Sequence, residues 1–187
     1  MSVWQMVPPL VAGEVSEATA SADQQTADVQ IVSDISLTIS ERNLMKTWRQ
    51  KIDKQDRPAS TLQHYIVKPH MKWERAENGR KKYQRFSCVG FVIACYKAAD
   101  IVVIDEGVSL PEADENVLQS AYPMIKELQR RPEKLRAKIF EHLGIEEQQR
   151  WRIMLPGYVF HALQRATALI PRPIPFVPTD VAEAEYP

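Results

Sequence analysis

Polar and apolar positions alternate through the middle of the chain. Thr61–Val67 places His64 on one face of an extended segment and Tyr65 on the other, as in a β-strand. Met71–Arg75 and Lys81–Phe86 then flank an Asn78-Gly79 pair, which is typical of a tight hairpin turn. The pattern predicts a small antiparallel sheet in this region.

Helical spacing predominates on both sides of this sheet. Ser40 is expected to cap a helix over Glu41–Lys51, and the apolar positions after Val89 predict a helix that ends near Ala99. The other elements expected are a strand over Ile101–Ile104, a polar loop over Leu110–Asn116, and helices over Pro123–Arg130, Pro132–Leu143 with Gly144 as its stop, Glu146–Met154 and Tyr158–Leu169. The fold class predicted is α+β: a small antiparallel sheet packed on a cysteine-bearing helix, followed by a mainly helical C-terminal half.

The chain divides into three parts by composition. Residues 13–28 have almost no large apolar side chains, so we expect residues 1–28 to form a disordered leader. Residues 29–169 are expected to form one domain. Residues 170–187 contain five of the thirteen prolines and are expected to be an extended tail.

Length and composition exclude several classes of protein. The chain has 187 residues, of which 44% are hydrophobic, enough for one core. No run reaches the about 18 apolar residues of a membrane span, and the N-terminus lacks the pattern of a secretory signal. Cys88 and Cys95 are two helical turns apart, roughly 10 Å along the axis, which is too far for a disulfide. We therefore expect free thiols in a cytoplasmic protein.

Charge is distributed unevenly although the formal net charge is zero. Residues 1–40 hold five acidic and no basic side chains, whereas residues 41–100 hold fourteen basic and six acidic ones. This basic segment, 42–97, is consistent with a solvated basic surface around a cleft, and as an alternative with a site that attracts nucleic acid or another anionic partner. Four aromatic residues interleave with it as stacking surfaces would: Trp48, Tyr65, Trp73 and Tyr83.

Cys88 is the strongest candidate for a catalytic nucleophile in this sequence. It begins the helix predicted after the hairpin, where free backbone N–H groups lower the pKa of a thiol and stabilise an oxyanion. A cysteine hydrolase also needs an imidazole base and a group that orients it. His64 is the expected base and His70 its competitor, while Glu74 or His70 would orient the imidazole.

Zinc is a weaker interpretation of the same residues. His64 and His70 are separated by five residues, and Cys88 and Cys95 by six, which does not match the short cysteine pairs of structural zinc sites. The chain also has no glycine-rich phosphate loop. The sequence therefore predicts no metal and no cofactor.

The run Ser87-Cys88-Val89-Gly90-Phe91-Val92 resembles the Asp-Cys-Ser-Gly-Leu-Val signature of the NlpC-type papain-like cysteine peptidases. It matches at Cys88, Gly90 and Val92, with Ser87 in place of the aspartate. Because His64 precedes the cysteine, the order is similar to that of the circularly permuted branch of this superfamily. The resemblance covers residues 60–105. It implies a papain-like domain in which Cys88 is the nucleophile, His64 the base, and His70 or Glu74 the third polar residue.

Three functions follow as hypotheses. The first is a thiol-dependent hydrolase or acyltransferase that cleaves a peptide, amide or lipid-ester substrate through a Cys88 acyl-enzyme. The second is a non-catalytic module that binds nucleic acid or another anionic partner through residues 42–97. The third is a structural or assembly protein that makes its contacts through the helical C-terminal half.

Overall fold

The computed structural model of this chain describes residues 3–5, 13–15, 35–55, 65–75, 79, 82–122, 125, 126, 128, 130–145, 150–164 and 174–184. These ranges contain five bounded α-helices and three two-stranded antiparallel sheets, which confirms the α+β class. In chain order the elements are β1 (Val3–Gln5), β2 (Gly13–Val15), α2 (Ile39–Asp53), β3 (Met71–Arg75), β4 (Lys82–Phe86), α3 (Cys88–Lys97), β5 (Glu112–Ala113), α4 (Glu115–Ala121), α6 (Glu133–Leu143), β6 (Trp151–Arg152), α7 (Pro156–Gln164) and the 3₁₀-helix η2 (Val181–Ala184).

The central hairpin, β3 and β4, forms as the alternation predicted. Lys72 lies opposite Arg85 in the antiparallel register. Gly79, in the connection, has a φ of +66°, a left-handed conformation that glycine adopts without steric cost. Because side chains alternate along a strand, Lys72 and Arg85 share one face of the hairpin and Phe86 belongs to the other.

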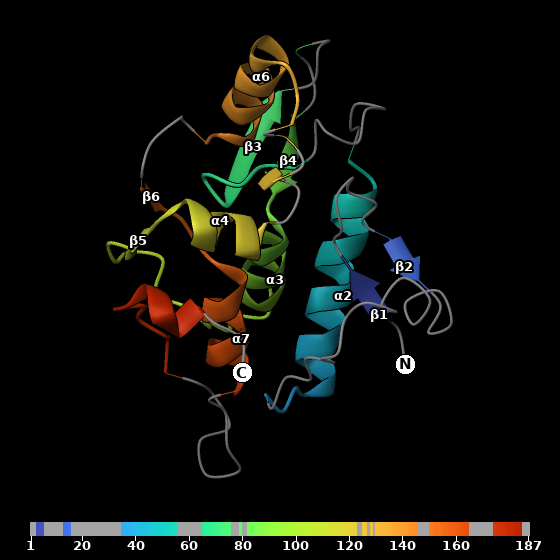
Figure 1. Cartoon of the computed structure of the whole chain (residues 1–187). Helices are drawn as coiled ribbons and strands as arrows, with labels where there is room; N and C mark the ends of the chain where they lie inside the picture. The colour runs from blue at the N-terminus through green and yellow to red at the C-terminus, as the bar shows by residue number, and fades with distance from the viewer. Residues whose placement is uncertain are drawn as a thin grey trace.

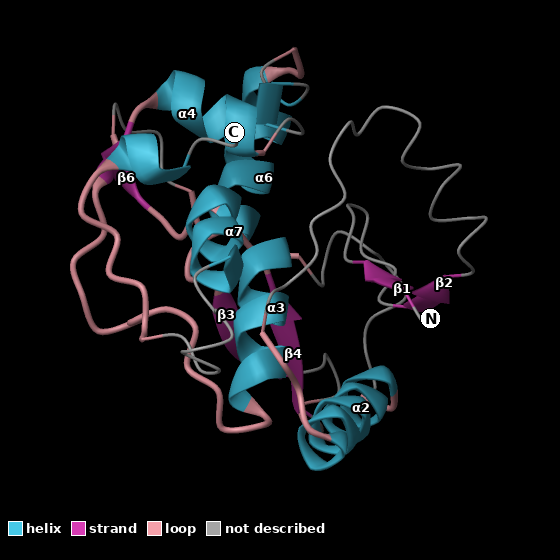
Figure 2. Ribbon diagram, turned by 90° about the horizontal axis from the view of Figure 1, so that it is seen from below, coloured by secondary structure: helices cyan, strands magenta, loops and turns pink. Residues whose placement is uncertain are grey.

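Helix α3 follows β4 directly and lies in the middle of the molecule. Ser87 is its N-cap, and the Ser87 hydroxyl accepts the backbone N–H of Gly90 at 2.9 Å. The helix lies between α2 and α7 (Figures 1 and 2) and buries six of its ten residues. This placement explains why its sequence is apolar on nearly every side.

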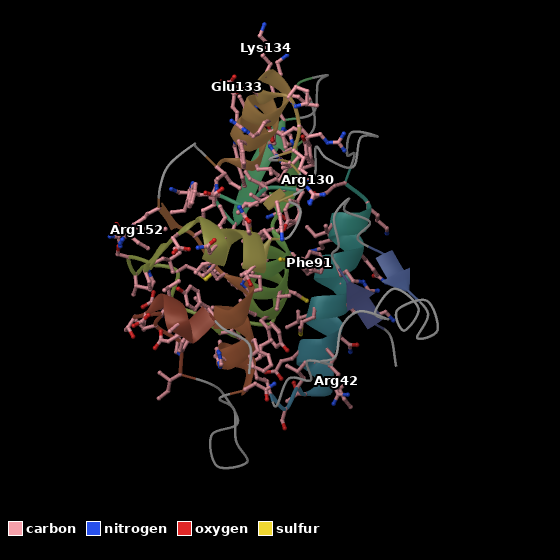
Figure 3. All side chains as sticks on the ribbon, in the orientation of Figure 1. Arg42, Phe91, Arg130, Glu133, Lys134 and Arg152 are labelled. Carbon is pink, nitrogen blue, oxygen red and sulfur yellow. The ribbon has the colours of Figure 1, made fainter. Side chains whose placement is uncertain are left out.

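Two apolar clusters meet at α3. The larger joins it to α4, α6 and α7 through residues such as Ile93, Leu118 and Tyr158. The smaller lies on the α2 side, where the rings of Phe91 and Trp48 are 5.3 Å apart. Figure 3 shows Phe91 projecting from α3 toward α2.

Helix α2 begins two residues before the position that the sequence suggested. Thr38, not Ser40, is the N-cap, and it forms a capping box with Glu41. The Thr38 hydroxyl accepts the Glu41 N–H, while the Glu41 carboxylate accepts the Thr38 N–H at 2.7 Å. The prediction missed the box because both Thr38 and Ser40 are good capping residues.

The C-terminal half agrees with prediction in α6 and differs elsewhere. Helix α6 ends at Gly144, which has a φ of +71°, as the sequence indicated. Part of the expected loop 110–116 instead forms β5 and the start of α4, capped by Asp114. The helix predicted over residues 146–154 is wrong at Trp151–Arg152, which pair with β5 as β6. Four neighbouring side chains are buried after Arg150, a pattern that a half-exposed helix does not give: Trp151, Ile153, Met154 and Leu155.

Both ends of the chain contain some regular structure in the described residues. In the expected leader, β1 and β2 pair as short antiparallel strands, and the remaining residues of that segment lie outside the described ranges. In the tail, buried Phe176 forms a bridge with Ile104, the one residue of the strand expected over Ile101–Ile104 that pairs. The helix predicted over Pro123–Arg130 lies partly outside the described residues. No helix in the described ranges is long and apolar enough to cross a membrane.

Candidate anion-binding pocket

The segment 65–70 contains His70 and, at Tyr65, contacts Cys88, and backbone hydrogen bonds hold it on two sides. On one side the N–H of Ile66 donates to the carbonyl of Phe86, and His70 accepts the N–H of Ser87 at 2.9 Å. On the other side Val67 and Lys68 both donate to the carbonyl of Leu143, at the end of α6. The segment is therefore fixed between β4 and α6.

Two glycines allow the helices to approach this segment closely. A Cβ atom on Gly90 would lie 1.8 Å from the carbonyl oxygen of His70. A Cβ atom on Gly144 would lie 1.6 Å from the carbonyl oxygen of Lys68. Both obstacles are backbone atoms, so neither contact admits a larger residue without movement of the chain.

The thiol of Cys88 faces Tyr65. The Tyr65 hydroxyl donates to Sγ at 3.9 Å, and it is the one side-chain partner of Cys88 among the described residues. Burial raises the pKa of Cys88, although this hydrogen bond and the backbone N–H groups act in the opposite direction. The expected lowering of this pKa is therefore wrong, because desolvation outweighs the helix N-terminus.

His70 lies on a different side of α3. A Cβ atom on Gly90 would lie 3.4 Å from Cδ2 of the His70 ring, so the ring lies beside Gly90. The Nε2 atom of His70 lies 2.9 Å from Oε1 of Glu106. Residues two apart on an α-helix are rotated by about 200°, so Cys88 and Gly90 point in nearly opposite directions. Among the described residues the structure does not pair Cys88 with His70.

Glu106 connects His70 to α3. Its second oxygen accepts Nζ of Lys97 at 2.7 Å. Burial alone would raise the pKa of Glu106, but the hydrogen bonds and charges of Lys97 and His70 outweigh it and lower the pKa. No pattern in the sequence indicated this carboxylate, which follows His70 by 36 residues.

The remaining predicted site residues have other placements. His64 lies outside the described residues, so its pairing with Cys88 stays a prediction. Glu74 accepts Nη1 of Arg85 at 2.9 Å, and among the described residues no hydrogen bond or ion pair joins it to His70. No group of three or more metal-binding side chains occurs within the described ranges.

The aromatic residues of the basic segment do not form a stacking surface. Tyr65 and Tyr83 are buried, and Trp48 packs against Phe91 in the smaller apolar cluster. Trp73 alone of the four is well exposed, at 55%. The expectation of interleaved stacking surfaces is therefore wrong, because only one of these four rings is well exposed.

Arg85, in contrast, is a buried cation, 3% exposed, beneath a polar pocket. Its Nη2 donates to the carbonyl of Tyr65 at 2.6 Å, and to both the carbonyl and Nε2 of His142 at 2.7 Å. Because a guanidinium only donates, Nε2 of His142 is the acceptor in this contact. The Arg85 Nε atom is also buried and has no hydrogen-bond partner among the described residues.

The pocket above Arg85 has a volume of about 360 Å³. Its charged lining comes from the 65–70 segment, the hairpin and α6, and comprises Lys68, Lys72, Glu74, Arg85, Lys138 and Glu141. These are four cations and two carboxylates, so positive charge is in excess. Glu74 is already paired with Arg85.

The three lysines that line the pocket are unpaired among the residues that the structure describes. Within the described part of the chain, none of Lys68, Lys72 and Lys138 forms an ion pair or a side-chain hydrogen bond. Lys138 and His142 share a face of α6 because they are four residues apart. A pocket lined by three lysines and a buried guanidinium is suited to a small anion.

The comparisons with protein-family models, curated proteins and solved structures find no match for this chain.

Proposed function

We propose that this protein is a binding module for a small anionic ligand, which it holds in the pocket above Arg85. The observation that carries the proposal is that three lysines without an ion pair among the described residues, Lys68, Lys72 and Lys138, line one pocket of about 360 Å³. Pockets of this size accommodate small ligands. This proposal takes up the second of the three hypotheses from the sequence and adds Lys138, which lies outside the basic segment.

Electrostatics supports an anion in this pocket. The lining has four cations and two carboxylates, so a bound anion would offset the excess positive charge that the free protein retains. The buried guanidinium adds positive potential beneath the three ammonium groups, and its hydrogen bonds to Glu74 and His142 keep it in place. A ligand that binds only the folded state would also stabilise the fold by mass action.

Calorimetric titration of the full chain with inorganic phosphate tests this proposal. We expect Lys138→Met to weaken binding by about tenfold, the loss of one charge-assisted contact. Lys134→Met is the matched control, because Lys134 projects from the outer end of the same helix, away from the molecule (Figure 3), and does not line the pocket. The control should change affinity less than twofold. Equal effects of the two substitutions, or no binding to the wild type, would contradict the proposal.

The thiol hydrolase hypothesis stays a prediction that depends on His64. The described residues give Cys88 a raised pKa and a tyrosine partner, which does not favour a thiolate nucleophile. The anion-binding proposal needs neither residue. The reactivity of Cys88 therefore tests the hydrolase hypothesis alone, and its outcome does not affect the anion-binding proposal.

A further inference from the structure

The hydrogen bonds of Arg85 restrict the kind of anion that this pocket can recognise. Proteins commonly bind carboxylates through the open fork of an arginine, with two parallel hydrogen bonds. Here Nη1 is engaged by Glu74, and Nη2 by Tyr65 and His142. Both terminal nitrogens therefore bond within the protein, and only Nε has no partner among the described residues. Two parallel N–H groups are not free for a carboxylate, so recognition of the anion falls to the lysines.

Lysine ammonium groups act as point charges that suit phosphate oxygens. Three of them approach from three segments, which matches the several oxygens of one phosphate group better than the two of a carboxylate. A phosphate monoester also carries a charge of about −1.5 to −2 at neutral pH, close to the excess positive charge of the lining.

A nucleic-acid strand is a poorer fit. Binding of single strands combines a basic groove with aromatic rings on which successive bases stack. Trp73 is the exposed ring of the hairpin, but it is adjacent in sequence to Lys72 and Glu74, so strand alternation directs it to the opposite face. The pocket therefore has basic groups without a stacking ring beside them.

Glu141 gives the pocket a second type of contact. It lies three residues after Lys138 on α6, lines the pocket, and has no side-chain partner among the described residues. A carboxylate at this place would repel a ligand made only of phosphates. It would instead accept hydrogen bonds from hydroxyl groups on the rest of the ligand.

We infer that the pocket recognises a small phosphate monoester whose alcohol part carries hydroxyl groups. The three lysines hold the phosphate, and Glu141 accepts hydrogen bonds from the hydroxyls. The inference rests on the proposed function and narrows it to one class of ligand.

Titration calorimetry with matched ligands on the full chain tests the inference. Glycerol 3-phosphate supplies a phosphate and two hydroxyls, methyl phosphate supplies the phosphate alone, and succinate is a dianion without phosphate. We expect wild-type protein to bind glycerol 3-phosphate about tenfold more tightly than methyl phosphate, and methyl phosphate more tightly than succinate. Glu141→Ala should bring the two phosphate esters to within about twofold of each other.

Other outcomes distinguish this inference from the proposed function. Succinate binding as tight as that of the phosphate esters would overturn the phosphate assignment and leave an anion pocket. Tighter binding of a single-stranded ten-residue oligothymidylate than of glycerol 3-phosphate would overturn the small-molecule assignment. A preference for glycerol 3-phosphate that survives in Glu141→Ala would overturn the role of Glu141. The absence of binding by every anion would contradict the proposed function as well.

Discussion

Gly144 and Gly90 each touch a backbone carbonyl of the segment that forms one wall of the pocket, at Lys68 and His70. Replacement of Gly144 by alanine should destabilise the protein by more than about 2 kcal/mol in urea unfolding, from left-handed strain and the clash with Lys68. Gly79→Ala is the matched control, since Gly79 has a φ of +66° but open space around it. That variant should lose only about 1 kcal/mol, the cost of the backbone conformation. Equal losses would show that the close contact is unimportant.

The raised pKa of Cys88 makes a prediction about thiol reactivity. Burial also raises the pKa of Cys95, to about 11, so a Cys95→Ser background isolates Cys88. In that background the rate of alkylation by iodoacetamide should inflect above about 8.5, the value of a free thiol. Tyr65→Phe removes the hydrogen bond that favours the thiolate, so it should move the inflection higher. An inflection below that of a free thiol would instead support the acyl-enzyme hypothesis.

At the scale of elements, the start of α2 depends on Thr38. Thr38→Ala removes the side chain that caps the Glu41 N–H and should cost about 1 kcal/mol in thermal or urea unfolding. Ser40→Ala tests the position that the sequence suggested and should be close to neutral, because Ser40 is already inside the helix. A larger loss for Ser40→Ala than for Thr38→Ala would be inconsistent with the observed helix start.

Glu106 links the 65–70 segment to α3 in a manner that depends on pH. Its pKa is lowered in the folded protein, so its contribution to stability is complete above the pKa of an unfolded glutamate, about 4.3. That contribution is lost as the pH falls through the lower pKa of the folded state. Between pH 6 and pH 3 the free energy of unfolding of the wild type should fall more steeply than that of Glu106→Gln. Parallel profiles would contradict the predicted linkage.

Elements with local signals were predicted well from the sequence. The β3–β4 hairpin follows from alternation and a glycine turn, and the end of α6 follows from Gly144. The pairing of β5 with β6 could not be predicted, because its two strands are short and Trp151 pairs with Ala113 across 37 intervening residues. Residues near Trp151 are apolar whether they form a buried strand or a buried helix, so periodicity does not separate the two.

The candidate pocket is formed by residues that are distant in sequence and meet only in the folded molecule. Its cations come from the 65–70 segment, the hairpin and α6, and the sequence pattern related only Lys68, Lys72 and Arg85 to one basic segment. Lys138 and His142 had no visible connection to that segment before the fold was known. The stacking interpretation was wrong for a related reason. The sequence places Tyr65 and Tyr83 in strands but does not indicate that both are buried.

The affinity of the pocket for an anion should depend on the salt concentration. Binding that depends on several exposed ammonium groups should weaken as sodium chloride rises from about 50 to 500 mM, since screening shortens the range of charge interactions. Calorimetry at the two salt concentrations measures this effect. Affinity for phosphate that is unchanged across this range would indicate a contact other than the lysines.

The most direct test of the account is to locate a bound anion in solution. Amide resonances of ¹⁵N-labelled protein, titrated with inorganic phosphate, report which backbone positions respond. We expect saturable shifts concentrated near Lys68, Lys72 and Lys138, with α2 and its exposed basic residues little affected. Shifts that are largest in α2, or that grow without saturation over the whole basic segment, would contradict a specific anion pocket above Arg85.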